Sequence, residues 1–146
     1  MKLDKCISIG SDHAGYELKE EIIGFLKSIG YSVIDKGAFS GKAVDYPEFG
    51  HKVGNSILKK EANKGIVVCG SGIGISIAAN KVRGIRAALC YTKSHAKMSR
   101  LHNDSNVLAL GSRIKGDDYF EIVKVWLNTN FEGGRHQDRI EKIECQ

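Results

Sequence analysis

The sequence predicts an α/β fold, a three-layer sandwich in which a five-stranded parallel sheet lies between two layers of helices. Two observations lead to this prediction. Short apolar runs alternate with longer amphipathic stretches along the 146 residues, which is the pattern of strand–helix units joined by right-handed crossovers. The short runs are rich in Val, Ile and Ala without strict alternation, as in parallel strands that are covered on both faces.

Each short run is a predicted strand, and each amphipathic stretch is a predicted helix. We expect strands at residues 6–10, 31–35, 65–69, 85–91 and 106–110. We expect helices at about 15–29, 48–60, 73–81, 93–101 and 117–128. Pro47 lies where the first turn of a helix favours proline. After the glycine pair at 133–134, a short polar helix is expected in the tail.

The chain is expected to form one domain over residues 1–146, since it has neither internal repeats nor a linker. Residues 131–146 could pack on this chain or reach across to a partner subunit. No apolar stretch approaches the roughly 20 residues of a membrane helix, and the first residues do not resemble a signal peptide. The four cysteines lack the spacing of a zinc site and suit a reducing cytoplasm.

The net charge of +5 is modest, and the basic residues are scattered along the chain. Nucleic-acid-binding proteins usually carry a basic stripe or a recognisable module, and neither is visible here. We therefore expect no nucleic-acid partner. A few of the positive residues are expected to bind an anionic small molecule instead.

The most informative segment begins at Cys69, which ends the third predicted strand and precedes the glycine-rich turn at 70–74. A thiol there lies among backbone N–H groups and near the positive end of a helix dipole, a setting that favours the thiolate. The same N–H groups can hold an anion. The alternative is a small buried side chain, the commonest fate of a free cysteine.

The sequence of this segment excludes three familiar phosphate-binding motifs. A P-loop would end in Lys-Ser/Thr, and a dinucleotide fingerprint would need a different glycine spacing. A cysteine phosphatase would need arginine where Ile75 stands.

Other candidate residues follow from the rule that ligands bind beyond the carboxyl ends of parallel strands. Asp12 and His13 follow the first strand, with helix capping by Asp12 as the alternative. His102 ends a predicted helix that runs back about 15 Å from the carboxyl edge, so it can hardly reach Cys69 of its own chain. If His102 is catalytic it serves a second subunit; otherwise it is a charge partner at a helix terminus.

Arg135 and Arg139 are four residues apart and therefore share one face of the predicted tail helix. Two guanidinium groups with His136 beside them could clamp a phosphate. The alternative is a solvated face, because much of this segment is polar.

Taken together, these motifs resemble the ribose-5-phosphate isomerase B family, which also includes galactose-6-phosphate isomerase subunits. The resemblance runs over essentially the whole chain, in order. The segments that carry it are 10–15 (GSDHAG), 45–47 (DYP), 69–80 (CGSGIGISIAAN), 100–104 (RLHND), 106–111 (NVLALG) and 133–137 (GGRHQ).

The resemblance implies a Rossmann-like aldose–ketose isomerase that converts ribose 5-phosphate to ribulose 5-phosphate through an enediolate, with neither a metal nor an organic cofactor. It implies that Cys69 is the base and that His102 opens the sugar ring. It also implies a homodimer or homotetramer with sites at the dimer interface. The implied substrate-binding residues are Asp12, His13, Gly70, Ser71, Gly72, Ile73, Gly74, Asn103, Arg113, Arg135 and Arg139.

Two alternatives remain open from the sequence. A hexose 6-phosphate such as allose or galactose 6-phosphate could be the substrate, because pocket length is not readable from sequence. A non-catalytic sugar-phosphate or nucleotide sensor could use the same glycines and arginines, but it would need neither Cys69 nor His102.

Overall fold

The computed structural model describes residues 2–145, in which five strands form one parallel sheet. The strands are β1 (Cys6–Ser11), β2 (Ser32–Asp35), β3 (Lys64–Cys69), β4 (Ala87–Leu89) and β5 (Val107–Gly111). Their spatial order is β2-β1-β3-β5-β4, and every neighbouring pair is parallel. The predicted five-stranded parallel sheet is confirmed.

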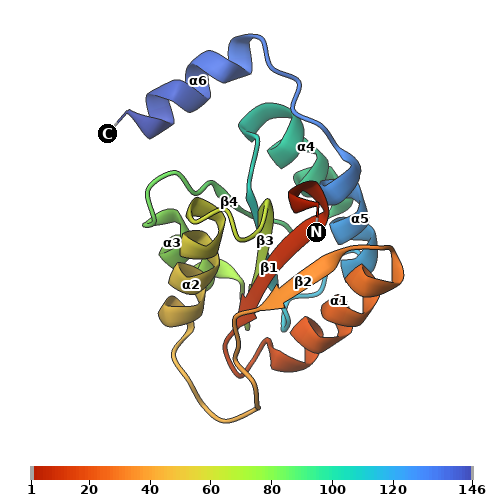
Figure 1. Ribbon diagram of the computed structural model, residues 1–146. Coiled ribbons are helices and arrows are strands. Elements are labelled where there is room, and N and C mark those ends of the chain that lie inside the picture. Colours follow the sequence, from red (N-terminus) through yellow and green to blue (C-terminus); the bar gives the residue numbers. More distant parts are fainter. Residues whose placement is uncertain (1, 146) are drawn as a thin grey trace.

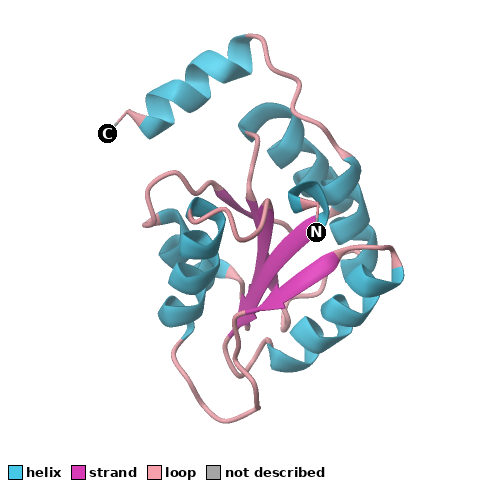
Figure 2. Cartoon of the chain, in the orientation of Figure 1, coloured by secondary structure: helices cyan, strands magenta, loops and turns pink. Residues whose placement is uncertain are grey.

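Helices cover both faces of the sheet (Figures 1 and 2). On one face lie α1 (Tyr16–Ser28), α4 (Lys93–Asn103) and α5 (Tyr119–Asn128), and on the other lie α2 (Tyr46–Leu58) and α3 (Ile73–Asn80). The predicted three-layer sandwich is therefore confirmed. The tail helix α6 (Arg135–Glu144) lies near the amino ends of the strands, at the top of Figure 1.

Each face of the sheet has its own apolar core. Ile9, Val68 and Trp126 belong to the core beneath α1, α4 and α5, whereas Val53 and Ile75 belong to the core beneath α2 and α3. Side chains of β3, β4 and β5 alternate between the two cores, so these strands are apolar on both faces, whereas Ile7 and Ile9 of β1 belong to the first core only. Each fully buried large aliphatic side chain stabilises the fold by about 1.5–3 kcal/mol.

Several element boundaries differ from the predictions. The fourth strand is shorter than 85–91: it begins later, because the N–H of Ile85 is used in a turn bond to the carbonyl of Val82, and it ends at Leu89. Helix α2 begins at Tyr46, with Pro47 in its first turn. Helix α4 extends to Asn103. A short 3₁₀ helix (Leu3–Lys5) was not anticipated, and the predicted tail helix extends to Gln146, which lies outside the described residues.

Helix α2 packs unusually close to its neighbours because glycines line its contacts. A Cβ at Gly50 would lie 3.0 Å from Ala78 Cβ and from the carbonyl oxygen of Ile75, both in α3. On the sheet side, a Cβ at Gly10 would lie 3.0 Å from the side chain of Val53. This close approach fixes the position of the first turn of α2, which begins beside the carboxyl end of the sheet.

Across residues 2–145, none of the helices combines the length and the apolar character needed to cross a membrane.

Candidate active site

The Cys69 thiol lies at the carboxyl end of β3, as the sequence predicts. Its Sγ accepts a hydrogen bond from the N–H of Gly72 at 3.1 Å. Helix α3 starts at the next residue, and the N–H groups in the first turn of a helix have no partner within that helix. The side chain is 4% exposed and contributes to the core beneath α3. The thiol is thus mostly covered by its own subunit but is bonded to an amide of the turn.

Gly72 has to be glycine for the turn to take this shape. Its φ is 76°, a left-handed value that strains residues with a Cβ. A Cβ there would also lie 2.8 Å from the carbonyl carbon of Leu110 and 3.0 Å from the nitrogen of Gly111. The turn therefore rests directly on the backbone at the end of β5.

The loop after β5 holds the turn through backbone hydrogen bonds. The N–H of Ser112 donates to the carbonyl of Cys69, and the N–H of Arg113 donates to that of Gly70, each at 2.9 Å. The hydroxyl of Tyr91 donates to the carbonyl of Ser71 at 3.0 Å. The Ser71 hydroxyl accepts from the N–H of Ile73 at 3.1 Å. These bonds fix the backbone conformation of the turn.

Three more predicted residues surround this turn. Asp12 is buried and accepts a hydrogen bond from the N–H of Gly15 at 3.0 Å, which closes the turn before α1 but does not cap the helix, whose N-cap is Gly15. His13 is exposed, and its Nδ1 lies 3.1 Å from backbone atoms of Val44 in the loop before α2. The Arg113 side chain lies over Gly70, since a Cβ there would be 3.4 Å from Arg113 Cδ. Polar groups from three strand ends therefore meet at one edge.

Tyr46 also belongs to this edge, although it was not among the predicted site residues. Its ring lies against Gly74, where any side chain would collide with it. Tyr46 is 40% exposed, so the ring forms a wall beside the turn rather than part of the core. The sequence signal that could have pointed to Tyr46 is the position of residues 45–47, which follow the second predicted strand toward the same edge of the sheet.

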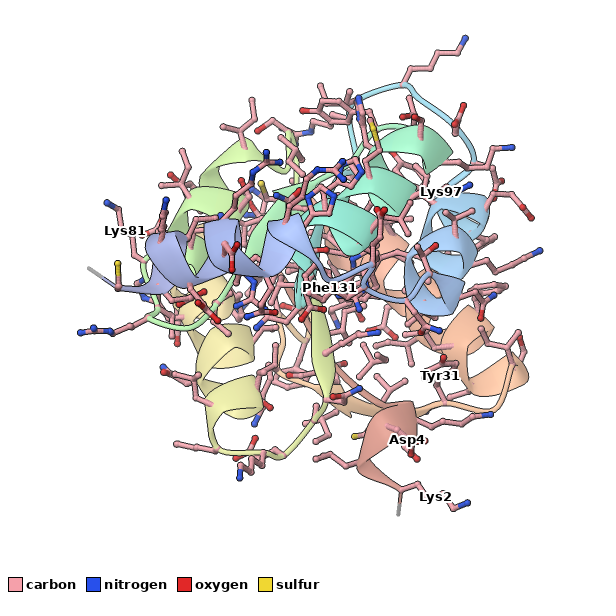
Figure 3. The ribbon with its side chains drawn as sticks, turned by 90° about the horizontal axis from the view of Figure 1, so that it is seen from above. Lys2, Asp4, Tyr31, Lys81, Lys97 and Phe131 are labelled. Carbon is pink, nitrogen blue, oxygen red and sulfur yellow. The ribbon has the colours of Figure 1, made fainter. Side chains whose placement is uncertain are left out.

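The remaining predicted residues lie at the opposite, amino edge of the sheet. The carbonyl of Asn103 accepts a 3.0 Å hydrogen bond from Arg86, the residue just before β4. His102 is in the last turn of α4. Arg135 and Arg139 are exposed on α6, which lies across this end when the molecule is seen from above (Figure 3). A single subunit therefore does not bring His102 to Cys69, as expected from the length of the predicted helix that ends at His102.

His102 has two neighbours that the sequence did not reveal. Its ring stacks on that of His136 with 4.4 Å between centroids, and the carboxylate of Glu132 lies beside both rings. Burial, the charge of Arg135 and the nearby His102 lower the pKa of His136, while Glu132 opposes this shift. Arg86 holds α6 in place through an ion pair with Glu144 at 2.8 Å.

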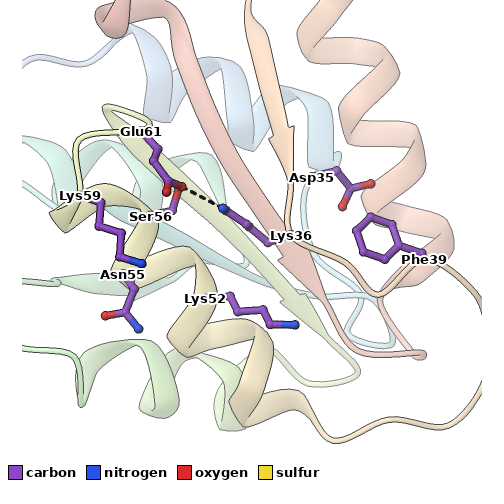
Figure 4. A pocket seen from close by; sticks show the side chains of 8 residues that line it. All are labelled: Asp35, Lys36, Phe39, Lys52, Asn55, Ser56, Lys59 and Glu61. Carbon is purple, nitrogen blue, oxygen red and sulfur yellow. Dashed lines mark hydrogen bonds and ion pairs between the residues drawn. The ribbon is translucent and has the colours of Figure 1, made fainter.

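A pocket of about 390 Å³ lies between the β2 edge of the sheet and α2 (Figure 4). The ammonium of Lys36 pairs with Glu61 at 2.8 Å, and Ser56 donates to the same carboxylate. These two bonds lower the pKa of Glu61. None of the predicted site residues is among those that line it: Asp35, Lys36, Phe39, Lys52, Asn55, Ser56, Lys59 and Glu61. The pocket is therefore separate from the candidate active site.

Comparison with known proteins identifies the family. Residues 7–143 match the family model described as Ribose/Galactose Isomerase. The chain is 49% identical over 140 residues to ribose-5-phosphate isomerase B of Escherichia coli strain K12, covering 95% of this chain and 94% of that protein.

Solved structures agree with this result. Ribose-5-phosphate isomerase B of Clostridium thermocellum superposes with a TM-score of 0.93 at 56% identity, over 95% of each chain. The type B ribose 5-phosphate isomerase of Trypanosoma brucei superposes with a TM-score of 0.92 at 44% identity, over 96% of this chain and 97% of that one. This chain belongs to the ribose/galactose isomerase family.

Proposed function

We propose that this protein interconverts D-ribose 5-phosphate and D-ribulose 5-phosphate, with Cys69 as the catalytic base. The observation that carries the proposal is the Cys69 thiol at the end of β3, hydrogen-bonded to Gly72 beside the first turn of α3. Family membership and relatives named ribose-5-phosphate isomerase B support the choice of substrate.

In the proposed reaction, the Cys69 thiolate removes the proton from C2 of the open-chain aldose. The electron pair of that C–H bond forms the C1–C2 double bond of an enediolate, and the carbonyl electrons move to O1. The amides of residues 70–74 that are not already bonded to Cys69 Sγ or Ser71 Oγ stabilise the negative oxygen. Removing one such donor from other enzymes costs about 3–4 kcal/mol of barrier. Cys69 then returns the proton to C1, and the carbonyl forms at C2 as the O2 proton is transferred to O1.

The remaining site residues are assigned to binding and ring opening. Asp12 and His13 would bind the sugar, together with Asn103. Arg113, Arg135 and Arg139 would hold the phosphate, whose binding energy positions the reacting carbons. His102 would open the furanose ring.

We propose that the active protein is a homodimer, or a homotetramer built from two such dimers, because this assignment needs groups from both edges of the sheet. In a two-fold dimer the partner subunit's His102 would meet Cys69. The exposed face of α3 supports such an interface. Ile73 and Ile77, one turn apart beside the site, are 49% and 54% exposed, and a partner would cover them. The four free cysteines agree with a cytoplasmic location.

A coupled assay on ribose 5-phosphate, allose 6-phosphate and galactose 6-phosphate tests the substrate. We expect kcat/KM to be highest for the ribose ester. A clear preference for a hexose ester would select the alternative substrate, and binding without turnover of any of the three would indicate a sensor.

The variant Cys69→Ala tests the base. Turnover should fall by about 10²-fold or more, the usual contribution of general base catalysis, while ribose 5-phosphate still binds. Cys6→Ala is the matched control, since it removes an equally buried thiol at the amino end of β1. Substantial turnover in Cys69→Ala would refute the assignment.

A further inference from the structure

Three metal-ligating side chains meet at the amino edge of the sheet. Glu132 Oε2 lies 3.5 Å from His136 Nε2 and 4.0 Å from His102 Nε2. The three ligand atoms, one from each side chain, all lie within 4.8 Å of one another. Two imidazoles and a carboxylate form the donor set of many zinc sites that keep a fourth position open.

His136 supplies the observation that points to a ligand. Its side chain is 5% exposed, and Nε2 is buried with no hydrogen-bond partner among residues 2–145. The contact with Glu132 is close but lacks hydrogen-bond geometry. A buried polar atom without a partner destabilises the folded state, because it has lost its hydrogen bond to water. A metal ion between the two groups would satisfy both.

The backbone holds the three residues in place. His102 is in the last turn of α4 and His136 is in the first turn of α6. The N–H of Glu132 donates to the carbonyl of Leu101 at 3.1 Å, which ties the segment before α6 to the end of α4. The Arg86–Glu144 ion pair fixes the far end of α6. The donor atoms are therefore brought together by the fold itself.

The His102 ring has to move to complete a tetrahedral site. Zinc–ligand bonds of about 2.0–2.2 Å place tetrahedral donors roughly 3.3–3.5 Å apart. The Glu132–His136 separation already fits, whereas the His102 ring has to turn out of its stack on His136, because two stacked rings direct their nitrogen lone pairs side by side rather than toward one ion. His102 is 40% exposed and has room to do so. The nearby Arg135 and Arg139 repel a cation at this site, and the carboxylate of Glu132 offsets that repulsion.

We propose that His102, Glu132 and His136 bind one divalent transition-metal ion per chain, with zinc as the preferred ion, and that this ion inhibits the enzyme. The inhibition rests on the proposed function, in which His102 opens the sugar ring. A metal bound to Nε2 occupies the lone pair that ring opening needs. The binding itself does not depend on that function.

The first test measures binding without substrate. Calorimetry with ZnCl₂ should show one site per chain in the wild-type protein, and CoCl₂ should give the visible absorption bands of four-coordinate cobalt. Glu132→Gln should weaken zinc binding by more than about tenfold, since the loss of even an outer-shell partner costs about 10–100-fold. Glu141→Gln is the matched control, because Glu141 is also an acidic residue near the surface of α6 but bonds to Gln137; it should bind zinc as the wild type does.

The second test measures inhibition. Zinc should inhibit wild-type turnover reversibly, with recovery on adding EDTA. Glu132→Gln should keep its basal turnover and need at least tenfold more zinc for the same inhibition. Equal zinc binding by Glu132→Gln and Glu141→Gln, or no binding by the wild type, would overturn the site. Undiminished inhibition of Glu132→Gln would refute these three residues as the inhibitory site. An inactive protein that still binds zinc with this pattern would refute the function and support the site.

Discussion

Replacing Gly72 with alanine should destabilise the protein and disable the site together. Two costs add in the folded state. A φ of 76° places a Cβ in the left-handed region, at about 1–2 kcal/mol. The Cβ would also lie 2.8 Å from the carbonyl carbon of Leu110 and 3.0 Å from the nitrogen of Gly111. Backbone atoms cannot rotate away as a side chain can, and overpacking of this kind costs about 1–3 kcal/mol. We expect a total loss of about 2–5 kcal/mol in the free energy of unfolding.

Gly30→Ala isolates the first cost. Gly30 has a φ of 90°, but no other atom lies within 4 Å of the point that a Cβ would occupy, so only the loss of about 1–2 kcal/mol is expected. Urea unfolding followed by circular dichroism measures both variants, and the coupled assay measures their turnover. Gly72→Ala should lose turnover, because the N–H that bonds to Cys69 Sγ is displaced, whereas Gly30→Ala should keep it. Equal destabilisation of the two variants would refute the steric argument.

Three other predictions concern the subunit interface, the Tyr46 ring beside the turn and the partly buried charge of Lys64. Mixing inactive His102→Ala and Cys69→Ala proteins under conditions of subunit exchange should restore part of the turnover, and no recovery despite exchange shown by mass spectrometry would contradict a shared site. Gly74→Ala should raise KM by pushing the Tyr46 ring aside, yet cost less than about 1 kcal/mol of stability, since alanine favours the helix; an unchanged KM would show that the ring does not shape the site. Burial lowers the pKa of Lys64 from 10.5 to about 8, with a further lowering from Arg100. The charged lysine therefore destabilises the fold fully below pH 8, and this penalty fades as the pH rises toward 10.5, so Lys64→Met should raise the free energy of unfolding by about 1–3 kcal/mol at pH 7. Urea unfolding at pH 7 and pH 10 measures the difference, and an equal gain at both values would contradict it.

Local sequence pattern was sufficient to predict the strands and the position of Cys69. Apolar runs without alternation are a property of the strand itself, and a thiol followed by glycines determines a turn over a few residues. The prediction that His102 cannot reach Cys69 of its own chain also needed only the rise per residue of a helix. The structure places His102 and Cys69 at opposite edges of the sheet. These features depend on residues that are close in the chain.

What the sequence did not reveal depends on contacts between distant segments. The position of β5 between β3 and β4 is a choice of crossover that no single segment determines. The stack of His102 on His136 requires α6 to fold back over the end of α4. The contact of Tyr46 with Gly74 requires two helices to approach each other. In each case tertiary packing, rather than local preference, decides which side chains meet.

The close packing of α2 at Gly50 and Gly10 limits how this enzyme could evolve to accept a larger sugar. A helix that already touches its neighbours through Gly50 and Gly10 cannot shift inward, and an outward shift would open a void in the core. Room for an additional carbon would have to come from residues 36–45, the connection that precedes this helix. Selection for new substrates should therefore concentrate its changes in that connection, and libraries that randomise it should outperform those that randomise α2.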